Sequence, residues 1–205
     1  AHYLIARMGD TYRELYGDLD KALESFEEAL ELARALNNVE REAIMLGLVG
    51  IVRFGQGEKD AKRYLEEGYN LAKLAQLDVV LTRNLLHLSY IACHEHDWRA
   101  ARLYSLESVT LTTASNQTEQ RKNLFFSLLN LGEAEAKLGD LEAALSARQQ
   151  ALEVALNQGN SLWKAYALEG IAEIQHDLGN RPLAQENFQV ALELFYQNNA
   201  LTDME

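Results

Sequence analysis

The segment HLSYIACHEHD, from His87 to Asp97, is the richest in side chains that could bind a metal ion. It holds three histidines and the only cysteine of the chain, Cys93, all of which bind zinc and other transition metals. Zinc ligands on one helix prefer spacings of three or four residues, whereas His87 and His94 are about 10 Å apart along a helix axis. Cys93 and His96 have a suitable spacing, but His96 falls where we predict a turn. We therefore predict no metal site and assign these residues to a turn and to a binding surface.

Glycine motifs that could hold phosphate are incomplete. Gly50-x4-Gly55 begins like a phosphate-binding loop, but Gln56-Gly57 follows where lysine and serine or threonine would be needed. Gly55-x-Gly57 lacks the third glycine of a dinucleotide-binding loop and any preceding strand. No paired carboxylates stand in an apolar setting, and no serine has a recognisable base. We predict neither catalysis nor a cofactor.

Composition favours an all-α protein. The chain has 205 residues and a single proline, Pro182, and long stretches are rich in strong helix formers. Its net charge of −12 disfavours direct binding to nucleic acid or anionic lipid surfaces. No apolar run is long enough to span a membrane, and the first residues do not resemble a signal peptide. With its single cysteine, this composition predicts a cytoplasmic protein.

The elements that would position any site form a repeat of about 40 residues. Similar sequence motifs, called phrases below, begin at Gly17, Gly57, His96, Gly139 and Gly179. Two examples are GDLDKALESFEEALELA and GDLEAALSARQQALEVA. Small and large apolar residues recur within them at spacings of four and three, which places them on one helix face. An acidic or amide residue that could cap the next helix follows each opening: Asp18, Glu58, Asp97, Asp140 and Asn180.

These phrases resemble the second half of a tetratricopeptide repeat. Leu128, Leu131 and Gly132 match first-helix positions of that family in the fourth unit, as Leu46, Val49 and Gly50 do in the second. The resemblance implies an all-α, right-handed solenoid of five helix-turn-helix units, with about ten antiparallel helices in one domain, over 1–38, 39–78, 79–117, 118–159 and 160–199. The usual first-helix tyrosine is replaced, by Arg53, Ala92, Glu135 and Gln175 in units two to five. The long period is similar to that of repeats attached to bacterial signal-transduction ATPases and multidomain transcription regulators. It is also similar to that of repeats in eukaryotic adaptors of the cell-polarity type.

In this family, the first helices of successive units line a concave surface that binds a partner. Mapping the family positions onto this chain predicts a surface that is apolar in its middle and charged at either end. We expect it to include Arg7, Leu48, Ile51, Phe54, Arg83, His87, Tyr90, His94, Phe126, Asn130, Glu133, Lys137 and Glu173. The alternative for Leu48, Ile51 and Phe54 is packing against an adjacent unit, and the alternative for Tyr90 and Phe126 is the core.

The resemblance implies a protein- or peptide-binding module that senses or recruits a partner. Both ends lack a capping helix, so we expect a fragment of a larger regulatory protein. A structural scaffold or homodimerisation solenoid without a separate ligand is the alternative. A weaker alternative is a metal- or small-molecule-binding solenoid built around His87, Tyr90 and His94.

Overall fold

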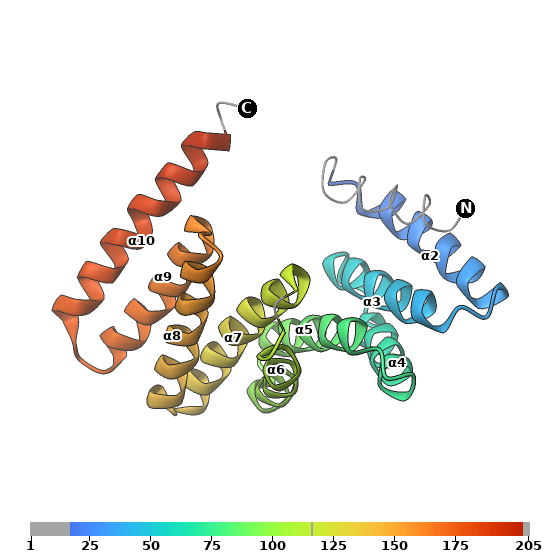
Figure 1. The fold of residues 1–205 in the computed structure, drawn as a ribbon, viewed down its shortest axis with the longest axis horizontal. Helices are drawn as coiled ribbons and strands as arrows, with labels where there is room; N and C mark the ends of the chain where they lie inside the picture. The colour runs from blue at the N-terminus through green and yellow to red at the C-terminus, as the bar shows by residue number, and fades with distance from the viewer. Residues whose placement is uncertain (1–16, 116, 203–205) are drawn as a thin grey trace. The chain divides into compact units, whose positions relative to one another are not determined.

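The computed structural model describes the backbone of residues 17–115 and 117–202, and the side chains of this part up to residue 198. These residues form nine helices and no strand, which confirms the predicted all-α repeat (Figure 1). None of the described helices combines the length and apolarity needed to cross a lipid bilayer. The helices are α2 (Leu19–Ala35), α3 (Val39–Gly55), α4 (Ala61–Leu74), α5 (Asp78–His94), α6 (Trp98–Thr112), α7 (Thr118–Leu138), α8 (Leu141–Asn157), α9 (Ser161–Asp177) and α10 (Arg181–Thr202).

The turns between helices recur as the sequence predicts. A residue with positive φ stands at nearly every helix end, so the chain reverses about every 20 residues and two helices fill one 40-residue period. Glycine fills most of these positions, and His96 takes the same left-handed conformation, with φ of 59°. The histidine therefore serves as a turn residue, as predicted. The positions are Gly17, Asn37, Gly57, Gln76, His96, Gly139, Gly159 and Gly179.

Three of the predicted helix caps are present, and one prediction is wrong. The side chains of Asp18, Asp97 and Asp140 each accept a hydrogen bond from a backbone N–H in the first turn of the following helix, at 3.0–3.1 Å. Glu58 does not cap α4, because that helix begins three residues after Glu58, at Ala61. For Asn180, the described contact is instead a hydrogen bond from its side-chain amide to Gln175 Oε1, at 2.8 Å.

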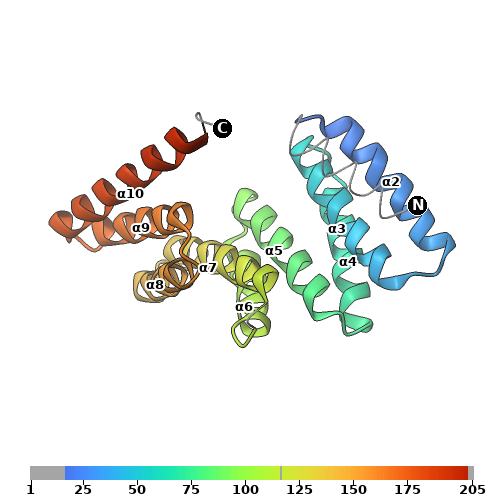
Figure 2. The same ribbon diagram turned by 45° about the horizontal axis from the view of Figure 1, so that its top comes forward.

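Contacts within the chain group it into two compact parts, residues 1–91 and 92–205. From here on these two parts, and not the five repeats, are called the first unit and the second unit. In the first unit, α3 packs against both α2 and α4 (Figure 2). Phe26 of α2 and Leu65 of α4 are fully buried there, each at the large position of its small–large–small phrase. Asn84 of α5 is also buried, and its amide donates to the Ala43 carbonyl at 3.4 Å. Apolar side chains at helical spacing thus form the core of this unit.

In the second unit, each helix from α6 to α10 packs against the next, and α7 also contacts α9. Phe125 and Leu128 of α7 are buried beside Ala151 of α8 and Ala167 of α9. Trp163, near the start of α9, stacks on Phe125 with ring centroids 4.7 Å apart. The contact between α7 and α9 brings two predicted first helices together, with the second helix α8 packed against both.

Candidate functional site

The first unit carries part of the predicted binding surface, with one correction. Leu48 is only 8% exposed and belongs to the core around Phe26, so its side chain is not available to a partner. Its side chain packs with apolar side chains of α2, and removing this apolar surface from water is favourable. Ile51 is half-buried and packs against the same core.

An aromatic pair forms the open part of the predicted surface in the first unit. Phe54 of α3 and Tyr90 of α5 meet edge to face with ring centroids 5.9 Å apart. Tyr90 is 43% exposed, so the packed-core alternative does not describe it. Arg83 and His87 of α5 are half-buried.

The remaining predicted residues lie in the second unit, except Arg7, which lies outside the described residues. Phe126, Asn130 and Glu133 of α7 are half-buried, and Phe126 meets Trp163 edge to face at 5.9 Å. Lys137 of α7, Glu173 of α9 and His94 of α5 are exposed. The structure brings three of these residues, Glu133, Lys137 and Glu173, to one pocket.

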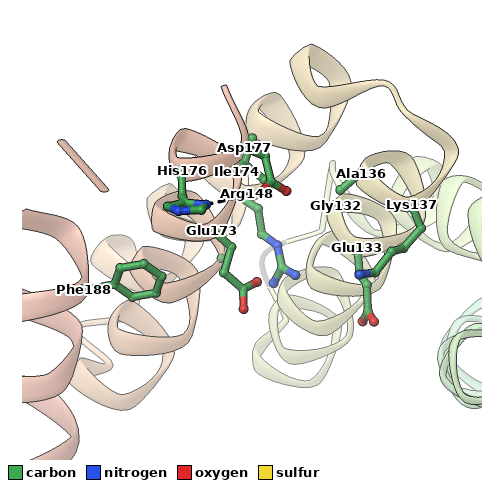
Figure 3. A pocket seen from close by; sticks show the side chains of 11 residues that line it. Gly132, Glu133, Ala136, Lys137, Arg148, Glu173, Ile174, His176, Asp177 and Phe188 are labelled. Carbon is green, nitrogen blue, oxygen red and sulfur yellow. Dashed lines mark ion pairs between the residues drawn. The ribbon is translucent and has the colours of Figure 1, made fainter. Parts of the chain in front are cut away.

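This pocket opens between α7 and α9 and has a volume of about 650 Å³ (Figure 3). Glu133 and Lys137 stand on one side, and Glu173 stands on the other. Phe188 of α10 closes one end, and Arg148 of α8 reaches in from the second helix layer. The lining residues are Gly132, Glu133, Ala136, Lys137, Arg148, Gly170, Glu173, Ile174, His176, Asp177 and Phe188.

Two glycines make room for Arg148. A Cβ added to Gly132 of α7 would lie 2.9 Å from Arg148 Nε, and one added to Gly170 of α9 would lie 2.6 Å from both Nε and Cζ. Real Cβ atoms do not approach neighbours so closely, so the arginine occupies space that only glycine leaves open. Arg148 therefore passes between α7 and α9, with its guanidinium directed into the pocket (Figure 3).

The Arg148 guanidinium stands in the pocket without a direct partner for its Nε. Its Nε is buried and has no hydrogen-bond partner, and no ion pair of Arg148 occurs among the described residues. Burial lowers the pKa of Arg148, while the charges of Glu173, Glu133 and Glu169 favour the protonated form. These carboxylates thus act on the guanidinium through space rather than by direct pairing.

The pKa of the Glu173 carboxyl is raised, whereas that of Arg148 is lowered. Partial burial raises its pKa, nearby Glu169 and Glu133 raise it further, and Arg148 and Lys137 oppose them. At the same rim, His176 Nδ1 lies 3.5 Å from an oxygen of Asp177. The pocket therefore combines cationic and anionic side chains.

Sequence reasoning did not find Arg148, although a signal for it exists. The position lies between Ala144 and Ala151, where three of the four other repeats carry Phe26, Leu65 and Phe188 and the third repeat carries Ser105. An arginine at a position that three other repeats fill with a large apolar residue indicates a departure from simple core packing. The pattern of small residues alone did not reveal it.

Two of the residues that replace the family's usual first-helix tyrosine form ion pairs with a neighbouring helix. Arg53 of α3 contacts Glu27 of α2 at 2.5 Å and Asp60 at 3.2 Å. The buried Glu135 of α7 meets Arg102 of α6 at 2.9 Å. These positions are thus used for packing within each unit and do not line the pocket.

Cys93 lies in the core of the second unit, beside Ala92, Ala101 and Ala134. Its thiol lies 3.9 Å from the Asn130 carbonyl oxygen. Among the residues that the structure describes, no three His, Cys, Asp or Glu side chains gather as metal ligands would. Its burial in this apolar cluster makes Cys93 a packing residue, which corrects its predicted place in a turn or on the binding surface.

We expect the Cys93 thiol to react slowly with iodoacetamide in the folded protein. Burial raises its pKa from 9.0 to about 12, with Glu133 adding to the rise. Since the thiolate is the reactive form, the rate at pH 8 should be about 1,000-fold below that of an unperturbed cysteine and should rise with pH. Mass spectrometry of timed samples measures this rate, with the protein in urea as the fast control. Equal rates in the folded and unfolded protein would contradict the buried placement.

The second unit matches a known repeat family. Residues 124–197 match the family profile for tetratricopeptide repeats. No curated protein matches the chain.

Solved structures of helical-repeat proteins match nearly the whole chain. A signal transduction ATPase with numerous domains from Pyrococcus horikoshii, described as having a tetratricopeptide repeat sensor, aligns with a TM-score of 0.82 and 15% identity. The alignment covers 98% of this chain and 30% of that one. BtubC from P. vanneervenii aligns with a TM-score of 0.80 and 17% identity, over 95% of this chain and 80% of that one. The Cut9–Hcn1 hetero-tetramer of APC/C aligns with a TM-score of 0.72 and 21% identity, over 95% and 33%.

Proposed function

We propose that this chain, which is a repeat protein of the tetratricopeptide type, is a protein- or peptide-binding module of a larger regulatory protein. Binding would occur on the surface formed by the first helices of the repeats, and the proposal involves no catalytic step. The resemblance to a sensor region that makes up only part of a longer ATPase supports the regulatory setting.

The observation that carries this proposal is the open surface of α7 and α9. These helices contact each other, yet Glu133, Lys137 and Glu173 surround a pocket instead of being sealed by packing. Such a surface offers both charged groups and a cavity for an inserted side chain. In the first unit, the Phe54–Tyr90 pair offers an exposed aromatic contact of the type that anchors partners.

The proposal predicts that a partner cross-links from one helix layer and not from the other. A photoreactive amino acid placed at Lys137 or Glu173 should capture the same protein in living cells. The matched control is Gln149 of α8, an exposed residue on the second helix layer. Mass spectrometry of the cross-linked bands identifies the captured protein.

Binding of the captured protein should then weaken about tenfold or more in Tyr90→Ala or Phe126→Ala, as expected for loss of an aromatic anchor. Capture from Gln149 alone, or no capture from either first-helix position, would contradict the proposed surface. Capture of a second copy of this chain would instead support the homodimer alternative.

A further inference from the structure

The Arg148 guanidinium is the one group in the pocket that packing within the unit does not explain. In the first two repeats, the same position holds a buried apolar side chain, Phe26 or Leu65, that fills the space between helices. Here a charged side chain occupies that space between Gly132 and Gly170, and its buried Nε lacks a hydrogen-bond partner. A charge placed in such a position without a direct partner is costly. A bound group that accepts hydrogen bonds from it would offset this cost.

The chemistry of that group follows from the guanidinium. Its planar set of N–H donors matches a carboxylate or phosphate, which can accept two parallel hydrogen bonds. Lys137 on the facing side of the pocket adds a second positive charge (Figure 3). The centre of the pocket therefore favours an anionic group.

The rim of the pocket restricts which anion can enter. Glu133 and Glu173 stand on opposite sides of the guanidinium, and Glu169 acts on it from nearby. A phosphate with two negative charges would be repelled by these carboxylates, whereas a carboxylate with an adjacent ammonium group would be attracted to both sets of charges. The volume of about 650 Å³ also exceeds what a lone carboxylate fills and lies in the range of small-molecule sites.

We propose that this pocket binds a small zwitterion, whose carboxylate accepts hydrogen bonds from Arg148 and whose ammonium group meets Glu133 and Glu173. An α-amino acid and a short peptide both carry this combination of charges. Lys137 adds attraction for the carboxylate, and Phe188 lines the apolar end where a side chain of the ligand would lie. The proposal goes beyond protein binding, because a small molecule alone would occupy the site.

Thermal unfolding with single probes tests this inference. The protein is heated with each common α-amino acid and with a set of dipeptides, at about 10 mM. We expect at least one probe to raise the Tm by about 3 °C or more, as a ligand that binds only the folded state does. Acetate, methylammonium and inorganic phosphate at the same concentration should leave the Tm unchanged, because each lacks one of the two charges or carries too much negative charge. The amino-acid and dipeptide probes show which source of the zwitterion is preferred.

Three variants test whether a ligand-induced rise in Tm comes from binding in the pocket. Arg148→Leu should lose the ligand-induced shift while remaining folded, since leucine already occupies the matching position in the second repeat. Glu173→Gln, which preserves size, should weaken binding about tenfold or more through loss of one charge contact. Arg99→Leu, at an exposed position of the same unit, should keep the full shift. The absence of a shift with every zwitterion, an equal shift with acetate or phosphate, or a shift that survives in both Arg148→Leu and Glu173→Gln would overturn the inference.

Discussion

Arg148→Leu should stabilise the protein in the absence of ligand, by about 1–3 kcal/mol. The substitution replaces a half-buried cation, whose buried Nε lacks a hydrogen-bond partner, with the kind of apolar side chain that Leu65 places at the same position of the second repeat. Replacing buried charge with well-packed apolar residues is often neutral or stabilising, and here no described ion pair is lost. Urea unfolding monitored by circular dichroism measures the change as a shift in the midpoint.

Arg99→Leu serves as the matched control for this prediction. Arg99 is exposed on α6 of the same unit, so its substitution should change stability by less than about 0.5 kcal/mol. A loss of more than about 1 kcal/mol in Arg148→Leu would mean that the arginine is held by favourable interactions within the chain. The stability gain would also show that this residue is retained for a reason other than folding.

Gly170→Ala should destabilise the protein by about 1–2 kcal/mol, although alanine is the better helix former. The new methyl group would lie 2.6 Å from Arg148 Nε and Cζ and 2.8 Å from Cδ, so the arginine would have to leave its place between the helices. This steric cost exceeds the gain of about 1 kcal/mol from replacing a mid-helix glycine. Thermal or urea unfolding of the two proteins measures the difference.

The same substitution should have the opposite sign in an Arg148→Ala background. Only Arg148 atoms are the nearest neighbours of the added Cβ, so truncating that side chain removes the clash and leaves the gain in helix propensity, about 0.5–1 kcal/mol. Gly55→Ala provides a control, because its Cβ would make an ordinary contact at 3.4 Å with Leu19 Cδ1. Equal effects of Gly170→Ala in both backgrounds would show that Arg148 does not occupy the space between the glycines.

Much of the fold could be predicted from local sequence. The 40-residue rhythm, the turn residues and the capping side chains of Asp18, Asp97 and Asp140 act within a few positions of themselves, so their patterns show directly in the sequence. Glu58 was assigned wrongly because the first turn of α4 starts at Ala61, a boundary that local preference does not define.

Prediction of the binding surface was weaker, because side-chain exposure depends on the neighbouring helices. Leu48 and Ile51 lie on the same helix, yet Leu48 is nearly completely buried against α2 and Ile51 only partly. The family positions placed Glu133, Lys137 and Glu173 on one surface, and the structure brings these three to a common pocket. Their meeting requires the contact between α7 and α9, which joins residues about 40 positions apart in the sequence.

The sequence by itself determined an all-α chain of repeated helix pairs, because small and large apolar residues recur at helical spacing and each turn carries its own signal. Only the tertiary structure decided that Arg148 passes between Gly132 and Gly170 into a pocket with Glu133 and Glu173. The physical reason is that a helix pattern fixes which residues share a face, whereas a cavity and its electrostatic field arise from four helices packed together.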